Sequence, residues 1–367
     1  MRKTEQLMSK SQHLVVSISA HGFGHVALTA PILNLLGRRH PGLALTVRSS
    51  VPLPHLQSRI HVPFTHLQSA GDIGMLMASA LEVDVQRSRT AYLEFHSDWD
   101  RRVDEEARLL DELKADLVFS NVGYLPLAGA QRAGMPNIAL CSLNWADIYR
   151  HYCGADAIAG QIHACYAGAD AFLRATPGMA MDDPATTGLK NLVPVEPIAD
   201  TGRNRRSEID RHLRLCGDEK LVLVSMGGVA TRLPIERWPR IEGVRYLVPQ
   251  AWHAQHPDAI AIETIPVSFP ELLTSVDALL CKPGYGSFVE AACSGIPVLY
   301  VDRPDWPESP ALTDWLMQNG VCCEVLRRDA ESGELGVSLQ RIWQRRPPLV
   351  TATGAAQAAD FLAKRLY

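Results

Sequence analysis

The sequence has 367 residues, 47% of them hydrophobic and 21% charged, which is enough for two domains with cores of their own. The formal net charge is −4 and no block of basic residues occurs, so the composition argues against a nucleic-acid partner. No apolar run approaches the ~20 residues that span a bilayer.

Cysteine usage and the first residues bear on the compartment. Eight cysteines are scattered with no Cys-x-x-Cys pair and no Cys/His ligand spacing, which predicts neither a zinc site nor a disulfide framework. Residues 1–12 are polar, are expected to be disordered, and lack the apolar core of a signal peptide. We therefore expect a cytoplasmic protein with reduced thiols.

Short apolar runs alternate with helical patterns through the first half of the chain. Strands are predicted at 13–19, 43–48, 116–120, 137–141 and 171–175, and helices at 26–39, 89–114, 124–133 and 156–168. Between 177 and 206 the pattern lapses and prolines, glycines and aspartates accumulate, which indicates an interdomain linker. An N-terminal domain is thus expected over residues 1–185.

The alternation then resumes. Strands are predicted at 220–225, 244–248, 259–263, 278–281, 297–301 and 321–325, and helices at 269–276, 286–294, 311–319, 334–345 and 352–366. These elements define a C-terminal domain over 207–350 and a closing segment over 351–367. Repeated βα units predict parallel, doubly wound sheets, so the expected fold class is α/β, with two Rossmann-like domains facing a cleft.

The first predicted strand runs into a glycine loop, HGFGHV at 21–26. Ligands bind at this end of the strands in open α/β sheets. Gly22 and Gly24 lack the third glycine of the dinucleotide fingerprint, and Arg48 ends the second strand where NAD would need a carboxylate. The loop therefore predicts a ligand other than NAD.

His21 and His25 flank the two glycines. They are either loop histidines whose nitrogens bond backbone carbonyls or, as their place at a strand's carboxyl end favours, functional groups. A neutral imidazole can remove a proton from an alcohol or from water. No nearby carboxylate completes a metal site with the two histidines, so no metal is expected there.

A second glycine turn lies late in the chain, CKPGYGSFVE at 281–290, between two apolar runs that read as strands. Gly284 and Gly286 let the backbone approach a ligand, and the N–H groups that open the following helix can receive a phosphate. Glu290, one turn further on, can accept hydrogen bonds from a ribose. The order of strand, turn and carboxylate predicts a nucleotide site.

These motifs resemble the GT-B superfamily of nucleotide-sugar glycosyltransferases, in particular the family 28 enzyme that forms lipid II and, further off, the UDP-glycosyltransferases. The resemblance spans nearly the whole chain. It comprises Gly-His at 24–25, Ser-Met-Gly-Gly at 225–228, and the pattern Cys-Arg-x-Gly-(x)5-Glu-(x)4-Gly-x-Pro, whose spacing residues 281–297 fit without a gap. Its late motif is the most specific of the three.

The resemblance implies that the C-terminal domain holds the nucleotide and the N-terminal domain the acceptor, with the closing helix crossing back to the latter. Glu290 would bind the ribose hydroxyls, and His25 would lie at the reaction centre beside His21. The predicted contacts to the rest of the nucleotide sugar are Gly24, Ser225, Gly227, Gly228, Lys282, Gly284, Tyr285, Gly286 and Ser287. Two of these have an alternative: Lys282 can point to solvent instead, and Tyr285 either stacks on the base or shields the turn.

Residues 302–309, DRPDWPES, depart from the pattern of these relatives, which present a polar pair such as Gln-Gln or Asp-Gln to the donor sugar. Arg303, Asp305 and Glu308 are candidates for that contact, but none matches the pair residue by residue. The donor sugar is therefore not determined. This segment and the first loop also resemble a domain of plant arabinokinases, which adds no clear activity.

The activity that the resemblance implies is transfer of a sugar from a nucleoside-diphosphate sugar, UDP-linked, to the hydroxyl of a small-molecule or lipid-linked acceptor. Helix N-termini and glycine-turn N–H groups can stabilise the leaving diphosphate, so neither a metal nor a cofactor is expected. His25 would be the general base of an inverting displacement. Candidate carboxylate partners for it are Asp98, Asp100 and Asp116.

Two alternatives remain open. The first loop also resembles that of the UDP-sugar hydrolase of pseudaminic acid synthesis, in which a histidine activates water, and a nucleotide-sugar-binding protein without turnover is the other alternative. The apolar run at 75–81 fits a contact with a lipid acceptor at a membrane surface, although packing explains it as well.

Overall fold

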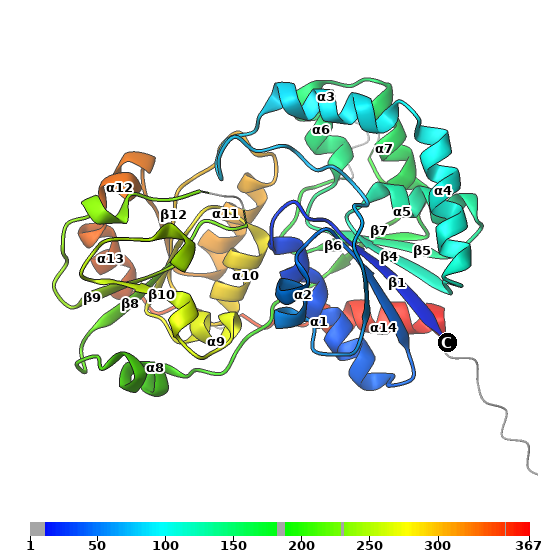
Figure 1. The fold of residues 1–367 in the computed structure, drawn as a ribbon. Coiled ribbons are helices and arrows are strands. Elements are labelled where there is room, and N and C mark those ends of the chain that lie inside the picture. Colours follow the sequence, from blue (N-terminus) through cyan, green and yellow to red (C-terminus); the bar gives the residue numbers. More distant parts are fainter. Residues whose placement is uncertain (1–11, 182–187, 229–230, 349) are drawn as a thin grey trace, which may run out of the picture.

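The computed structural model describes residues 12–181, 188–228, 231–348 and 350–367. The expected disorder at residues 1–11 and the expected domain boundary at 185 lie outside these ranges. The described chain forms two α/β units, each built on a single parallel sheet flanked by helices (Figure 1). No helix in the described part of the chain is long and apolar enough to cross a membrane.

The N-terminal unit contains a seven-stranded sheet in the order β3-β2-β1-β4-β5-β6-β7. Its strands are β1 His13–Ile18, β2 Ala44–Arg48, β3 Thr65–Leu67, β4 Leu117–Asn121, β5 Asn137–Cys141, β6 Ala171–Ala175 and β7 Leu192–Val195. Its helices are α1 Gly24–Arg39, α2 Leu53–Arg59, α3 Val85–His96, α4 Trp99–Glu112, α5 Tyr124–Arg132, α6 Trp145–Cys153 and α7 Ala157–Ala167.

The C-terminal unit contains a six-stranded sheet in the order β10-β9-β8-β11-β12-β13. Its strands are β8 Lys220–Ser225, β9 Val244–Val248, β10 Ala259–Ala261, β11 Ala278–Cys281, β12 Val298–Tyr300 and β13 Cys322–Glu324. Its helices are α8 Arg206–Leu213, α9 Phe269–Thr274, α10 Tyr285–Cys293, α11 Ser309–Asn319, α12 Arg327–Ser332 and α13 Gly336–Trp343, with short 3₁₀ turns at Ile235–Arg237, Gln250–Trp252 and Ile262–Thr264.

Central strands are apolar on both faces because helices cover both sides of each sheet. In β1, Leu14 and Val16 belong to the large core cluster that includes α1, whereas Val15 faces Leu110 of α4 and Ala130 of α5. The strand pairs described in the two sheets are parallel, as β1 with β2 and β4 illustrates. The predicted class, α/β with two doubly wound parallel sheets, is confirmed.

The strand order reverses between β1 and β4 in the first sheet and between β8 and β11 in the second. At such a switch point the connections leave in opposite directions, and a crevice forms at the carboxyl ends of the strands. The glycine loop with the two histidines, residues 21–26, follows β1, and we call it the histidine loop. The turn that begins Cys-Lys-Pro-Gly, residues 281–284, follows β11, and we call it the CKPG turn. Both glycine loops that the sequence singled out therefore lie at switch points.

Several element boundaries differ from those predicted. The single helix expected at 89–114 is two helices, α3 and α4, because Ser97 and Asp98 interrupt it and Asp98 has non-helical backbone angles. β7 adds a seventh strand to the N-terminal sheet from within the stretch expected to be a linker. Helices α2, α6, α8 and α12 and strand β3 were not predicted.

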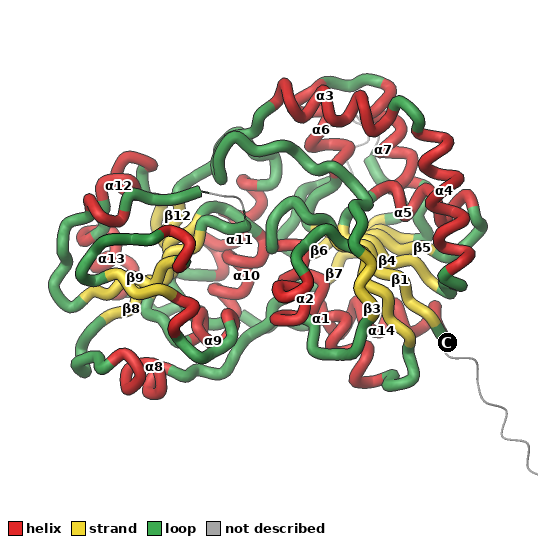
Figure 2. The backbone as a smooth tube through the Cα atoms, in the orientation of Figure 1, coloured by secondary structure: helices red, strands yellow, loops and turns green. Residues whose placement is uncertain are grey.

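The closing helix α14, Gly354–Leu366, lies against the N-terminal unit and not against the sheet that precedes it in sequence (Figure 2). Its Asp360 accepts a hydrogen bond from Arg39 at the end of α1 at 2.5 Å. The N–H of Gly354 donates to the carbonyl of Pro197 at 3.0 Å, and the side chain of Gln357 accepts from the N–H of Glu196 at 2.8 Å. The chain thus crosses between the units a second time.

A short hairpin at residues 77–83, closed by the bridge between Met77 and Val83, also joins the two units. Ala80 is fully buried within the C-terminal core cluster, and its N–H donates to the hydroxyl of Thr231 at 2.7 Å. Glu82 pairs with Arg327 of α12 at 2.5 Å. We call this segment the bridging hairpin.

Candidate functional site

The two switch points face each other across the domain interface. A Cβ atom placed on Gly228 would lie 3.0 Å from the backbone nitrogen of Phe23 and 3.2 Å from the Cα of Gly22. A Cβ on Gly286, in the first turn of α10, would lie 3.1 Å from the Cβ of Ala27. The glycine turns of the C-terminal unit therefore touch the histidine loop and the first turn of α1, and any larger residue at Gly228 or Gly286 would have to displace these neighbours.

His25 lies in the first turn of α1 and is 8% exposed. Its Nδ1 is 3.0 Å from Oδ1 of Asn121, the last residue of β4. The amide nitrogen of Asn121 already donates to the hydroxyl of Thr29 at 2.8 Å and to the carbonyl of His25 at 3.2 Å, so its oxygen is the atom that faces the imidazole. Nδ1 of His25 must then carry the proton, which leaves the lone pair on Nε2.

Burial lowers the pKa of His25 to about 4, although its hydrogen bond to Asn121 opposes the shift. The ring is therefore neutral at neutral pH. None of the candidate carboxylates is the partner of His25. Asp98 and Asp100 form ion pairs with Arg101 and Arg132 on the outer helices, and Asp116 accepts a hydrogen bond from the backbone of His13.

His21 lies in the same loop among aromatic rings. Its ring centroid is 5.0 Å from that of Trp145 and 5.6 Å from that of Trp306, which come from opposite units. Its Nε2 is buried without a hydrogen-bond partner among the described residues. Burial lowers the pKa of His21 well below its ordinary value, and the charges of Lys282 and Arg303 act in the same direction.

Asp72 supports this aromatic group from the N-terminal side, and the sequence had given no sign of it. The buried carboxylate accepts from Nε1 of Trp145 at 2.8 Å and from the hydroxyl of Ser19 at 3.0 Å. Burial raises the pKa of Asp72 to about 6. Because Trp145 contacts the rings of both His21 and His25, Asp72 fixes the wall against which the two imidazoles pack.

Two cations from the C-terminal unit approach the same place. Lys282 follows β11, and its Cε would lie 3.2 Å from a Cβ on Gly227, so it extends over the Ser-Met-Gly-Gly turn. Arg303 follows β12 and is 4% exposed. In the described part of the chain neither forms an ion pair with a carboxylate, and burial lowers the pKa of Lys282 to about 8 and that of Arg303 to about 10. The charge of Glu308 opposes this lowering of the pKa for both cations without forming an ion pair with either. A desolvated cation that lacks a paired carboxylate is costly, which points to an anionic ligand.

Glu308 lies at the start of α11 in the same region and was a candidate sugar contact. Its carboxylate accepts from the hydroxyl of Ser142, at the end of β5, at 2.5 Å and from Nε1 of Trp306 at 3.1 Å. Burial raises the pKa of Glu308. This contact joins the two units beside the histidines, so Glu308 lies at the site, whereas Asp305 is largely exposed at its rim, 3.8 Å from His151.

Glu290 lies on the face of α10 that carries Gly286, one turn earlier, and so faces the N-terminal unit. Its carboxylate forms a buried ion pair with Arg59 at the end of α2. Burial raises the pKa of Glu290 to about 7 against the effect of Arg59. A cavity of about 360 Å³ opens near this pair, and its walls include Ser58, which precedes Arg59, and Asp200, which interacts with Glu290.

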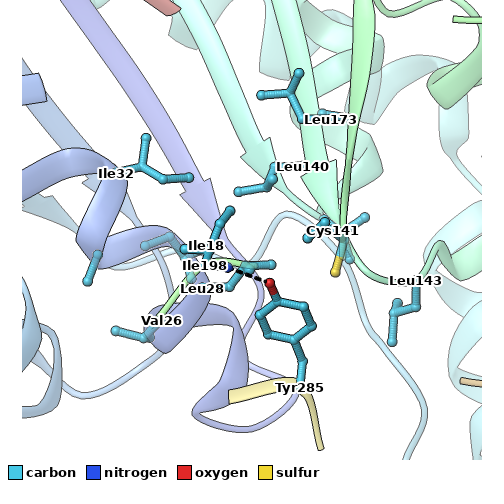
Figure 3. Close-up of a cluster of buried hydrophobic side chains, with 14 of the residues drawn as sticks. Ile18, Val26, Leu28, Ile32, Leu140, Cys141, Leu143, Leu173, Ile198 and Tyr285 are labelled. Carbon is cyan, nitrogen blue, oxygen red and sulfur yellow. Dashed lines mark hydrogen bonds between the residues drawn. The ribbon is translucent and has the colours of Figure 1, made fainter. Parts of the chain in front are cut away.

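Tyr285 points into the N-terminal core and not toward a base. Its hydroxyl accepts from the N–H of Ile198 at 3.0 Å and donates to the carbonyl of Thr176 at 3.1 Å. Figure 3 shows the ring among apolar side chains that include Val26 and Leu143. Of its two expected roles, stacking on a base is thus not supported, and Tyr285 holds the start of α10 against the N-terminal unit.

The remaining predicted residues lie in the three glycine-containing loops, which follow β1, β8 and β11. Gly24 begins α1, Ser225 ends β8, and Ser287 lies in the first turn of α10. A Cβ on Gly24 would meet no atom within 4 Å, and one on Gly284 would meet only the carbonyl of Lys282 at 3.9 Å. No packing contact therefore requires glycine at either position.

Comparisons with known proteins define the fold. No protein-family model matches the chain. L-arabinokinase of Arabidopsis thaliana is 24% identical over 364 residues, which cover 94% of this chain and 34% of that protein, so the chain spans about a third of its relative's length.

Solved structures align along nearly the whole chain. The glycotransferase of kitacinnamycin has a TM-score of 0.59 at 14% identity and covers 98% of this chain and 100% of its own, and the calicheamicin glycosyltransferase CalG4 has a TM-score of 0.56 at 14% identity with 97% and 98% covered. MnaA of S. aureus, solved with UDP, has a TM-score of 0.59 at 10% identity with 97% of both chains covered. The architecture is that of the GT-B fold, as the motifs implied.

Proposed function

We propose that the protein is a glycosyltransferase that moves a sugar from a nucleoside-diphosphate sugar, UDP-linked, to an acceptor hydroxyl, without a metal and with inversion. The observation that carries the proposal is the meeting of the two switch points. Glycine turns and two cations without ion-pair partners, Lys282 and Arg303, come from one unit. They face the imidazole of His25 from the other unit, which is neutral and carries its proton on Nδ1. Such a site combines an anion receptor with a base.

The diphosphate would bind on the C-terminal face. Backbone N–H groups at Gly227, Gly228 and the start of α10 lie at a helix N-terminus and a glycine turn, where anions are stabilised by oriented dipoles. Lys282 adds a full charge over the first of these turns. A fixed cation and several N–H groups can stabilise the developing charge of the leaving group without a metal ion.

The acceptor would lose its proton to His25. Because Nδ1 donates to Asn121, Nε2 is the basic atom, and it belongs to the unit opposite the diphosphate. A base and a leaving group on opposite sides of the anomeric carbon favour a single displacement with inversion. Water exclusion would come from the close contact of the two units, to which the bridging hairpin contributes.

The nucleoside would extend toward Glu290, whose carboxylate can accept hydrogen bonds from ribose hydroxyls in place of Arg59, and the nearby cavity offers room for it. Solved neighbours support a uridine nucleotide. UGT2 of Phytolacca americana was solved with UDP-2-fluoro-glucose and pterostilbene, with a TM-score of 0.55 at 12% identity, and MnaA was solved with UDP.

A lipid-linked acceptor and contact with a membrane surface gain no support from the apolar run at 75–81. Met75 is 3% exposed, and Ala80 is fully buried against the C-terminal unit. The apolar run therefore forms the first part of the bridging hairpin and the residues that precede it. We therefore favour a small acceptor over a lipid-linked one.

The test is a screen of UDP, GDP, dTDP and their sugars by thermal shift, followed by turnover assays with mixed acceptors and with a chelator present. A ligand at about 100 times its dissociation constant stabilises by about 2.7 kcal/mol. We expect UDP and a UDP-sugar to raise Tm and product to form in the presence of the chelator. Absence of a shift with every nucleotide would contradict the proposal.

Nucleotide-sugar hydrolysis is the second candidate, and the burial of His25 favours it. An imidazole that is 8% exposed is more readily reached by water than by a large acceptor. A hydrolase would release UDP at the same rate with and without acceptors, whereas a transferase would release it faster when its acceptor is present. The acceptor dependence of UDP release therefore separates the two.

A further inference from the structure

Arg303 is a buried cation of the site, 4% exposed, and it forms no ion pair with a carboxylate in the described part of the chain, although Glu308 and Asp305 lie near enough to act on its charge. The guanidinium lies over the ring of Trp306, 4.0 Å from the centroid. This stacking occupies one face of the group and leaves its N–H bonds, which lie in the guanidinium plane, free to bind. The planar fork is the geometry that pairs with a carboxylate or a phosphate.

The N–H groups of Arg303 have almost no partners in the described part of the chain. Nη2 donates to the sulfur of Met77 at 3.5 Å, which is a weak acceptor, and Nε is buried without a partner. Nε2 of His21 is likewise buried and unpaired in the same aromatic group. Unsatisfied buried donors cost free energy, so a ligand that accepts their hydrogen bonds would recover it.

Arg303 is placed differently from Lys282. Lys282 extends over the Gly227 turn, where the diphosphate is proposed to bind. Arg303 instead contacts Met77 of the bridging hairpin and stacks on Trp306, which neighbours Tyr152 of α6 with ring centroids 6.2 Å apart. Both Met77 and Tyr152 belong to the N-terminal unit. The guanidinium thus lies toward the sugar and acceptor side of the site.

We propose that Arg303 binds an anionic group, a carboxylate or a phosphate, carried by the transferred sugar or by the acceptor. This inference rests on the proposed function and narrows its substrate class to acidic sugars or acidic acceptors. The anionic oxygens take the place of the Met77 sulfur and pair with the guanidinium fork, while the stacking on Trp306 holds the guanidinium plane in position.

The first arm of the test measures the dissociation constants of UDP, UDP-glucose and UDP-glucuronate by calorimetry, with the wild type, Arg303→Gln and the control Arg328→Gln. If the acid is on the donor sugar, the wild type binds UDP-glucuronate about 10- to 100-fold more tightly than UDP-glucose, as a charged hydrogen-bond pair provides. Arg303→Gln loses that preference and keeps its affinity for UDP. Arg328→Gln, whose exposed side chain pairs with the adjacent Asp329 of the same unit, keeps both.

The second arm titrates glucose, glucuronate and glucose 6-phosphate into the wild type and Arg303→Gln, each saturated with UDP. An acid on the acceptor gives tighter binding of the charged sugars to the wild type alone. Two results overturn the inference: no acidic ligand is preferred over its neutral counterpart in either arm, or Arg303→Gln weakens UDP as much as the acidic ligands. The comparison of acidic with neutral ligands on the wild type does not depend on how any variant folds. Failure of UDP to bind to the wild type would instead overturn the proposed function.

Discussion

The two faces that meet between the domains differ in charge. On the N-terminal face, both histidines are neutral and packed against Trp145, and His25 is oriented by an amide, not by a carboxylate. On the C-terminal face, Lys282 and Arg303 lie near a helix N-terminus without an ion pair to a carboxylate, although the charge of Glu308 acts on both. Under the proposed function, the face that would hold the diphosphate and the face that would take up the proton come from different domains.

If the proposed function holds, this difference explains why catalysis needs both units. Holding a cation near His25 lowers the tendency of the imidazole to take a proton, so a site that placed base and diphosphate receptor on one face would weaken the base. Separate faces also let the reacting groups approach from opposite sides of the sugar. The contacts between the faces, Arg59 with Glu290 and Ser142 with Glu308, then set how closely they meet.

Removing the base from the N-terminal face should have the largest effect. We expect His25→Ala to lower kcat by about 10²- to 10⁴-fold, the range for a general base, while the dissociation constant for UDP stays unchanged because the diphosphate receptor is on the other face. Steady-state kinetics and calorimetry measure the two quantities. His212→Ala, an exposed histidine of α8, is the control. Equal loss of UDP affinity and turnover in His25→Ala would show that nucleotide binding and proton removal are not separated between the two faces.

Breaking the contact between the faces should cost stability. Arg59→Met leaves the carboxylate of Glu290 buried without its partner, and loss of one member of a buried pair costs about 3–5 kcal/mol of unfolding free energy. Arg59→Met combined with Glu290→Gln should recover part of this loss. Denaturant unfolding measures both variants, and an unchanged stability in Arg59→Met would mean that the pair does not hold the interface.

The same pair predicts a pH dependence. The pKa of Glu290 is raised to about 7 in the folded state, so this group favours folding below its ordinary pKa of 4.5 and loses that contribution as pH rises toward 7. Arg59 opposes the rise, and removing it should move the loss to higher pH. The destabilisation by Arg59→Met should therefore be larger at pH 8 than at pH 5.5.

A smaller and more specific effect is expected when the amide partner of His25 becomes a carboxylate. Asn121→Asp places a negative charge 3.0 Å from Nδ1 and favours the protonated ring, which raises the pKa of His25 from about 4. Since only the neutral ring acts as a base, the acid limb of the profile of kcat/KM against pH should move to higher pH. A limb that does not move would show that another group titrates.

Features formed by residues that are adjacent in the chain were predicted well from the sequence. Both glycine loops, the alternation of strands and helices, and the histidines at a strand end follow from residues that are adjacent in the chain. Asn121 and Arg59 could not be predicted, because they lie 96 and 231 residues from His25 and Glu290 and no short pattern marks them. Asp72 and Trp145 meet only because their loops converge at the same edge of the sheet.

Other errors have local physical reasons. β7 carries Pro194 and was read as linker, yet it is the edge strand of its sheet, where a proline need not donate to a neighbour. The sequence leaves two roles open for Tyr285, stacking on a base or shielding the turn, whereas in the structure it is the first residue of α10 and its side chain is directed into the N-terminal core. The direction of a side chain within a turn is set by tertiary contacts, which cannot be read from the sequence.

Binding of a diphosphate against the backbone of the CKPG turn is what the proposed function requires first, and Gly284 lies where this binding can be tested. A Cβ there meets only one protein atom, at 3.9 Å, and the backbone angles are extended, so Gly284→Ala should leave Tm unchanged, as should the control Gly217→Ala. Calorimetry with UDP should show binding to the wild type and to Gly217→Ala, and binding at least about 10-fold weaker to Gly284→Ala, equivalent to 1.4 kcal/mol. Equal affinities in all three proteins, or no binding of UDP to the wild type, would contradict the account.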